Sequence, residues 1–168
     1  MESILALSFV ILFSYVFFII RKFGVPESLS DSYYLLQDKY PNKGYKWLFT
    51  IVCFITMFSV LIPWLEVSKE SLQFLCFLSA SGLGFVGAAP LFKSYQQKIH
   101  ESGAILCGLA SQIWLFSNYY GWLTALCGLL MAIPYLKQKR NFIFYAEMTA
   151  FLSAYLGISI EYLKLVVS

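Results

Sequence analysis

The sequence is poor in charged residues. Only 12% of its 168 residues are Asp, Glu, Lys or Arg, whereas about a quarter are charged in a typical soluble domain. Hydrophobic residues make up 60% of the chain, which is more apolar surface than a water-soluble fold of this size can bury. We therefore expect residues 1–168 to form one domain whose main solvent is lipid. The net charge of +3 resides in loops rather than on a basic face, so no nucleic-acid partner is expected.

Histidine and catalytic motifs are also scarce. His100 is the only histidine, which argues against a membrane metal hydrolase that would use several histidines. The four cysteines lie within apolar runs without CxxC spacing, so neither a zinc site nor a disulfide framework is indicated. The chain has no G-x-S-x-G, P-loop, HExxH or dinucleotide-binding motif. We expect no metal and no cofactor, and a non-enzymatic function is favoured.

Long apolar runs are the main feature of the sequence. A bilayer core needs about 20 apolar residues per helix. The uncharged stretch 102–136 is too long for one helix, and Asn118–Gly121 offers a turn at its middle. The first run has no basic segment before it and no A-x-A cleavage site, so we expect a retained span. The sequence predicts an all-α bundle of six transmembrane helices at residues 3–20, 47–65, 71–92, 102–118, 121–136 and 142–160.

Positive charge alternates along the gaps between these runs. Ten of the twelve Lys and Arg residues lie in gaps one, three and five. Positive residues accumulate on the cytoplasmic side of a membrane protein. We therefore expect the N- and C-termini outside, loops one, three and five in the cytoplasm, and an inner or plasma membrane location. The pattern also requires the turn within 102–136, since a single span there would reverse the bias.

The first cytoplasmic loop predicts an amphipathic helix at about residues 28–40. A Ser-rich start follows Pro26, and Leu29, Tyr33, Leu36 and Tyr40 then recur at near-helical spacing. Such a helix would lie in the membrane interface.

Small residues recur at intervals of four within several spans. They allow helices to approach closely in lipid, where no hydrophobic force drives packing. We expect Ala80, Gly84 and Ala88 to form a helix-packing face, either inside the bundle or against a partner protein. The same spacing recurs at 104 and 108, at 128 and 132, and at 146, 150 and 154. The intramembrane polar residues Thr50, Thr56 and Gln112 are of the kind that form hydrogen bonds between helices.

Three ionisable residues are the candidates for a binding site. Glu147 lies roughly 9 Å into the last predicted span, and intramembrane carboxyl groups usually face the bundle interior. His100 opens the fourth span, and Asp31 begins the loop helix. The topology places all three near the cytoplasmic face, where they would form one polar pocket. The alternative is that Glu147 reaches water or pairs with the basic run Lys137–Arg140.

The segment Gly82–Pro90, followed by His100-Glu101-Ser102-Gly103-Ala104, is similar to a pattern in small six-helix membrane proteins of the damage-regulated autophagy modulator (DRAM) type and related bacterial membrane proteins. These have a glycine-rich helix, a short loop, and H-x-x-G-A at the start of the next helix. An acid early in the final helix, as at Glu147, is similar too. The resemblance covers about a third of the chain and implies association with membranes and lipids.

Together these features favour a multi-pass membrane protein that binds or transports a small molecule or lipid, with His100, Glu147 and Asp31 as the ligand-binding residues. A second hypothesis is an accessory or scaffold subunit that packs against a larger membrane protein through Ala80, Gly84 and Ala88. A third is a membrane-embedded hydrolase with water around His100.

Overall fold

The computed structural model describes residues 2–91 and 96–167. These residues form only helices and connecting turns, with no strand, so the predicted all-helical class is confirmed. In chain order the elements are α1 (Glu2–Phe23), α2 (Asp31–Lys39), α3 (Trp47–Val67), the 310 helix η1 (Glu70–Leu72), α4 (Gln73–Ala88), the 310 helix η2 (Ala89–Leu91), α5 (Gln96–Ser117), α6 (Gly121–Gln138) and α7 (Phe142–Val167).

Four helical segments are long and apolar enough to cross a membrane. They are Ser3–Phe23, Trp47–Val67, Glu70–Ala88 and Phe142–Val167. The segments predicted as spans at 102–118 and 121–136 are helical, in α5 and α6, but do not meet the same combined criterion of length, hydropathy and charge. The last residue predicted for the third span, residue 92, lies outside the described residues.

Backbone conformation explains two of the helix ends. Gly24 has φ +82° and its N–H donates to the Ile20 carbonyl at 2.9 Å, which is a common glycine ending for a helix such as α1. Tyr119 takes φ +63° at the end of α5, and the following Tyr120 N–H donates to the Leu115 carbonyl at 2.7 Å. This left-handed residue reverses the chain between α5 and α6, where the sequence predicted a turn.

The amphipathic helix predicted at about residues 28–40 is found as α2, and three of the four residues of its predicted stripe are buried, while Tyr40 is half-buried. Leu29, Tyr33 and Leu36 are all less than a tenth exposed. The Tyr15 hydroxyl of α1 and the Ser32 hydroxyl of α2 lie 2.6 Å apart in a buried hydrogen bond. The helix therefore covers one end of the bundle with its apolar face, while Tyr34 and Asp38 remain exposed.

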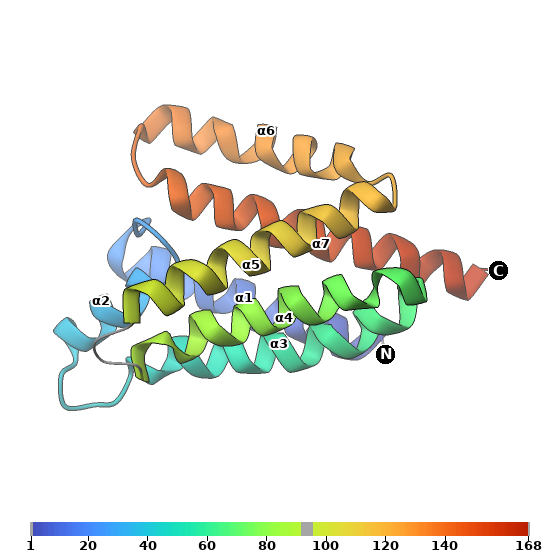
Figure 1. Ribbon diagram of the computed structural model, residues 1–168. Coiled ribbons are helices and arrows are strands. Elements are labelled where there is room, and N and C mark those ends of the chain that lie inside the picture. Colours follow the sequence, from blue (N-terminus) through green and yellow to red (C-terminus); the bar gives the residue numbers. More distant parts are fainter. Residues whose placement is uncertain (1, 92–95, 168) are drawn as a thin grey trace.

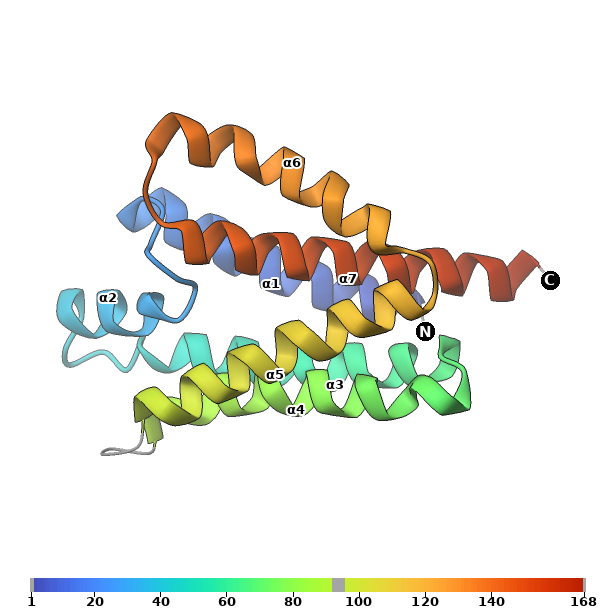
Figure 2. The same cartoon turned by 45° about the horizontal axis from the view of Figure 1, so that its top comes forward.

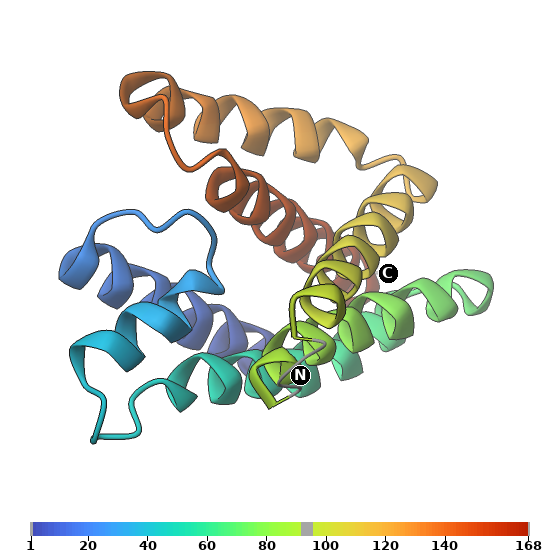
Figure 3. The same ribbon diagram turned by 60° about the vertical axis from the view of Figure 1, so that its left-hand side comes forward.

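The helices run roughly along one axis, so the molecule has two ends (Figure 1). We call the end with α2 the loop end and the end with both termini the terminus end; the rotated view keeps this separation (Figure 2). Helices α3, α4 and α5 pack successively, α1 packs on α3, and α7 packs on α3, α5 and α6. Viewed from the loop end, α6 lies at the periphery beyond α7 (Figure 3).

Close approach between α4 and α5 depends on two glycines. A Cβ at Gly82 would lie 2.5 Å from the Cys107 backbone nitrogen, and one at Gly103 would lie 2.8 Å from the Gly82 carbonyl oxygen. Of the predicted packing face, Ala80 is buried and a Cβ at Gly84 would lie 2.7 Å from the Met57 sulfur of α3. Ala88 is half-buried. Ala80 and Gly84 are thus covered by this chain's own helices.

Candidate functional site

A strap formed by residues 24–30 joins α1 to α2 and lies across the start of α7. The Asn141 side-chain amide donates to the Val25 carbonyl at 2.7 Å, and the Phe144 N–H donates to the Glu27 carbonyl at 3.0 Å. The first N–H groups of a helix have no partner within it, and the strap supplies one for α7. These bonds hold the strap over the first two turns of α7.

Glu147 of α7 forms a hydrogen bond with the strap. Its Oε2 accepts a hydrogen bond from the Leu29 N–H at 2.7 Å. The contact joins residues 118 positions apart in the sequence. A typical hydrogen bond contributes about 0.5–1.5 kcal/mol to stability, and more where the acceptor is ionised. The acid that the sequence singled out in the last span therefore contacts loop one directly, and not the basic run Lys137–Arg140, which is exposed.

Asp31 and His100 make further polar contacts at this end. The Asp31 carboxylate accepts from the Ser28 N–H at 2.8 Å, an arrangement that suits the first turn of α2 because the helix N-terminus carries partial positive charge. His100 Nε2 and the Ser30 hydroxyl lie 3.1 Å apart, and the Ser28 and Ser30 hydroxyls lie 2.8 Å apart. The strap is thus tied to α5 as well as to α7.

The three candidate residues line one pocket, which we call the mouth. Its volume is about 770 Å³. Its lining residues are Ser28, Ser30, Asp31, Tyr34, Phe49, Val86, Ala89, Pro90, His100, Glu101, Ala104, Ile105, Ile143 and Glu147. The structure therefore brings Asp31, His100 and Glu147 together, from α2, α5 and α7. That this pocket binds a ligand remains a prediction.

A second space, which we call the cavity, adjoins the mouth and lies within the bundle. Its volume is about 270 Å³, and its walls are mostly apolar side chains of α3, α4, α5 and α7. On α3 its lining extends from Phe49 to Trp64, fifteen residues and so about 22 Å along the helix. Mouth and cavity share the wall residues Ser30, Phe49, Val86, Ala104 and Glu147.

Several of the small residues expected to pack helices together also line this cavity. Ala80, Ala104, Gly108, Ala146, Ala150 and Ala154 all belong to its lining. A Cβ added at Gly108 would meet nothing within 4 Å. Short side chains therefore border a space on this face, and the expectation that the stripes mark close helix contact stays a prediction.

Two polar groups on residues of the cavity wall have no hydrogen-bond partner. They are the Thr56 hydroxyl and the Trp64 indole N–H, on side chains that are 1% and 3% exposed. Thr50 also has an unpartnered hydroxyl, so the expectation that the two threonines bond between helices is wrong. Gln112 does form such bonds: its carbonyl accepts from Thr124 of α6 at 2.6 Å.

The described lining of the mouth contains three acids and one histidine. Three of its lining residues are Asp31, Glu101 and Glu147, and none of its described lining residues is Lys or Arg. Burial lowers the pKa of His100, which lies just before the predicted span, although Asp31, Glu101 and the Val86 backbone partly oppose this shift. The neutral imidazole is therefore favoured at neutral pH. Within residues 2–91 and 96–167, no three His, Cys, Asp or Glu side chains are grouped so that they could hold a metal ion.

Comparisons with protein-family models, with curated proteins and with solved structures find no match for this chain. The class of the protein therefore follows from its own fold and site: described residues that are all-helical, with several helices long enough to span a membrane, and a polar mouth that shares wall residues with an apolar cavity.

Sequence reasoning missed the cavity and the strap. The signal for the strap was weak, since its contacts with α7 are made largely by backbone groups. The signal for the cavity was present in the alanine and glycine spacing, but that pattern does not distinguish a tight helix contact from a lined space.

Proposed function

We propose that the chain is a six-span membrane protein that binds a single-chain amphiphile, with its polar end in the mouth and its apolar tail in the cavity. The observation that carries the proposal is the position of Glu147, which lines both spaces. A molecule that occupies both must change from polar to apolar at that wall. This is the definition of an amphiphile.

The size and shape of the cavity support one alkyl chain. Pockets for drug-sized ligands usually have volumes of about 300–1,000 Å³. The mouth lies within this range, while the cavity is slightly smaller yet extends along most of α3. A space so narrow for its length suits a single chain better than a compact ligand or a lipid with two tails.

The proposed membrane topology has both termini outside and the loop end in the cytoplasm. The four long apolar helices support it, as does the reversal at Tyr119 that turns α6 back toward the loop end (Figure 1). Most large apolar side chains of α6, among them Leu129 and Ile133, are exposed, as expected of a helix that faces lipid. The mouth would then open toward the cytoplasmic face of an inner or plasma membrane.

Binding is supported more strongly than transport. At the terminus end of the cavity, the Trp64 and Trp114 rings meet edge to face with centroids 5.5 Å apart. Trp114 is fully buried and its indole N–H is bonded to Ser68 at 2.8 Å. Passage through the bundle would require this aromatic contact to open. Binding requires only that the ligand can enter through the mouth.

The test uses the protein in lipid nanodiscs and dodecyl amphiphiles brominated near the tail end, because bromine quenches a nearby indole. Three headgroups are compared: trimethylammonium, sulfate and maltoside. We expect at least one of them to quench Trp64 in a saturable manner, on top of the non-saturable quenching of the exposed Trp122. Trp64→Phe should remove the saturable part.

Ala150→Leu supplies the specific control, because it fills the cavity wall, whereas Ala125→Leu changes an exposed alanine of α6. Saturable quenching should disappear in the first variant and persist in the second. Absence of saturable quenching with all three headgroups, in a folded protein, would refute the proposed function.

A further inference from the structure

We infer that Trp64 of α3 forms the floor of the cavity and limits its ligand to amphiphiles with a straight tail of medium length. This inference rests on the proposed function and specifies the class of its ligand. It follows from the level at which the lining of the cavity ends on each helix, and from what lies beyond that level.

On α3 the lining follows one face of the helix and stops at Trp64. Its members are Phe49, Cys53, Thr56, Met57, Val60 and Trp64. The next residues at helical spacing, 67 and 68, are outside the lining. Ser68 is buried, and its hydroxyl donates to the Trp64 carbonyl at 2.6 Å. Beyond Trp64 this face of α3 is therefore covered by the chain itself.

The facing helices change from small to large side chains toward the same end. The small lining residues are Ala104, Gly108 and Ser111 on α5 and Ala146, Ala150 and Ala154 on α7. One turn beyond the last of these on α5 is Trp114, which is fully buried and outside the lining. One turn beyond the last on α7 is Ile158, which is 1% exposed and is the final lining residue of that helix. The space therefore ends toward the terminus end on three helices.

The floor is supported from behind. The Trp64 and Trp114 rings meet edge to face, an arrangement that adds to the stabilisation from burial alone. The Trp114 indole N–H donates to the Ser68 hydroxyl at 2.8 Å, and that hydroxyl bonds back to α3. A tail that reaches Trp64 can extend further only by breaking this packing.

The depth of the cavity gives the expected length of the tail. Glu147, which lines both mouth and cavity, and Ile158 are eleven residues apart on α7, or about 16 Å along the helix. An extended chain advances about 1.2 Å per covalent bond, because a residue of three bonds spans at most about 3.6 Å. A straight tail of about thirteen carbons would therefore reach from Glu147 to the floor.

The test uses the protein in lipid nanodiscs and a series of amphiphiles with tails from octyl to octadecyl. The series carries the headgroup that binds most tightly in the quenching test, and its members compete against the radiolabelled dodecyl compound. Affinity is expressed per mole fraction in the bilayer, because longer tails also partition more strongly into lipid. We expect little change up to the tridecyl or tetradecyl tail. Each further methylene should lower the affinity about fourfold, which corresponds to about 0.8 kcal/mol per methylene kept out of an apolar site.

Two variants should move this limit in opposite directions. In Trp64→Ala the Trp114 ring, whose centroid lies 5.5 Å from that of Trp64, becomes the floor, so the limit should rise by about four carbons. Ala154→Leu fills the wall seven residues beyond Glu147, about 10 Å along α7, so the limit should fall to about nine carbons. Trp122→Ala is the matched control, an exposed tryptophan of α6 outside the lining, and should leave the limit unchanged.

A gain of longer tails in Trp64→Ala supports the inference directly, because an unfolded protein cannot produce it. Affinity that stays constant up to the octadecyl tail in the unmodified protein would overturn the floor while leaving the amphiphile site intact. A limit that does not move in Trp64→Ala or in Ala154→Leu, while octyl binding shows that the variant folds, would also overturn it. If Trp64→Ala binds no tail at all, Ala154→Leu decides. The absence of saturable binding of the labelled compound by the unmodified protein would instead refute the proposed function.

Discussion

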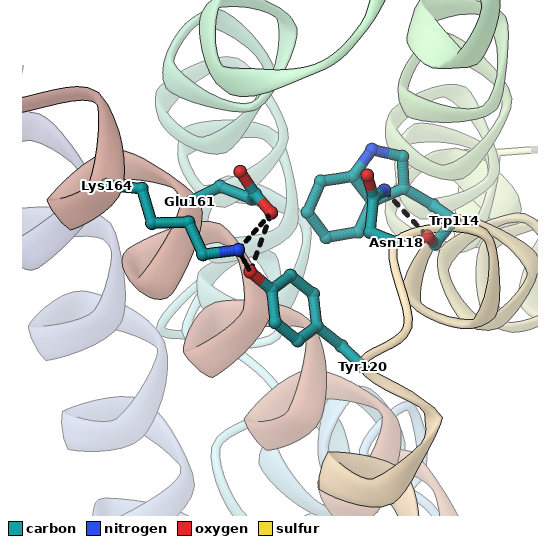
Figure 4. A network of polar contacts seen from close by, with 5 residues as sticks. All are labelled: Trp114, Asn118, Tyr120, Glu161 and Lys164. Carbon is teal, nitrogen blue, oxygen red and sulfur yellow. Dashed lines mark hydrogen bonds and ion pairs between the residues drawn. The ribbon is translucent and has the colours of Figure 1, made fainter. Parts of the chain in front are cut away.

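The polar groups at the two ends of the bundle have different surroundings. At the terminus end the Trp114 indole N–H donates to the Ser68 hydroxyl at 2.8 Å, and that hydroxyl donates to the Trp64 carbonyl at 2.6 Å. Tyr120 likewise donates to Glu161 at 2.6 Å, and Lys164 contacts both (Figure 4). These groups are partnered by the chain itself. At the loop end Asp31, His100 and Glu147 also have hydrogen-bond partners in the chain, but they line an open space of about 770 Å³.

This difference separates polar residues that stabilise the fold from polar residues that are placed for a ligand. Both ends carry carboxyl and hydroxyl groups on helices of the same bundle, so residue type alone does not distinguish them. Closure does. If the distinction is sound, changes at the loop end should alter ligand binding, whereas changes at the terminus end should alter only stability.

The largest effect is expected from Glu147→Ala. It removes the acceptor of the part-buried Leu29 N–H, and leaving such a donor unpaired costs about 1–3 kcal/mol. We expect a lower free energy of unfolding, faster amide exchange in the strap, and loss of saturable amphiphile binding. Unfolding in detergent and hydrogen exchange over residues 24–30 measure the first two. Glu147→Gln should retain the strap's protection, and equal deprotection in both variants would contradict the hydrogen bond's role.

Much of the loop end could be predicted from the sequence, because its signals are local or depend on topology. The apolar run lengths, the stripe at Leu29, Tyr33 and Leu36, and the alternation of positive charge each need no knowledge of packing. Together they predicted that Asp31, His100 and Glu147 lie at one end, and the structure places them in one pocket. The membrane orientation that the same alternation predicts stays a prediction.

The interior could not be predicted in the same way. The four-residue spacing of Ala146, Ala150 and Ala154 predicts that a neighbour can approach, but not that it does. The nearest approach of α4 and α5 is at Gly82 and Gly103, while the alanine face of α7 is left facing the cavity. Whether small residues close a contact or line a space depends on the tilt of every surrounding helix, which no local pattern encodes.

The two facing tryptophans offer the second comparison. Trp114→Phe and Trp64→Phe remove similar volumes from neighbouring rings, but only the first breaks a hydrogen bond. A typical hydrogen bond contributes about 0.5–1.5 kcal/mol. We therefore expect Trp114→Phe to lower the free energy of unfolding by about 1 kcal/mol more than Trp64→Phe, measured by equilibrium unfolding in detergent. Equal losses would show that the Trp64 N–H has a partner, such as a bound ligand, in the protein as purified.

A smaller effect is expected where α5 meets α6. Thr124→Val removes the hydroxyl that donates to the Gln112 carbonyl at 2.6 Å, and such bonds in membranes contribute about 0.6 kcal/mol on average. Thr149→Val is the matched control, because that hydroxyl donates to the Tyr145 carbonyl within its own helix. We expect a measurable loss of stability in the first variant alone, and amphiphile binding unchanged in both. Weakened amphiphile binding in Thr124→Val would contradict the division between residues that affect binding and residues that affect only stability.

The smallest effect is expected at Lys164, although its contacts are the most conspicuous in Figure 4. Its side chain is 62% exposed, and exposed ion pairs are weakened by solvent and by salt. Lys164→Met should therefore leave the unfolding midpoint unchanged within error at 0.15 M salt, while Tyr120 keeps its bond to Glu161. A clear loss of stability that grows at low salt would mean that the terminus end depends on this pair. Altered amphiphile binding would mean more, since Lys164 lines neither the mouth nor the cavity.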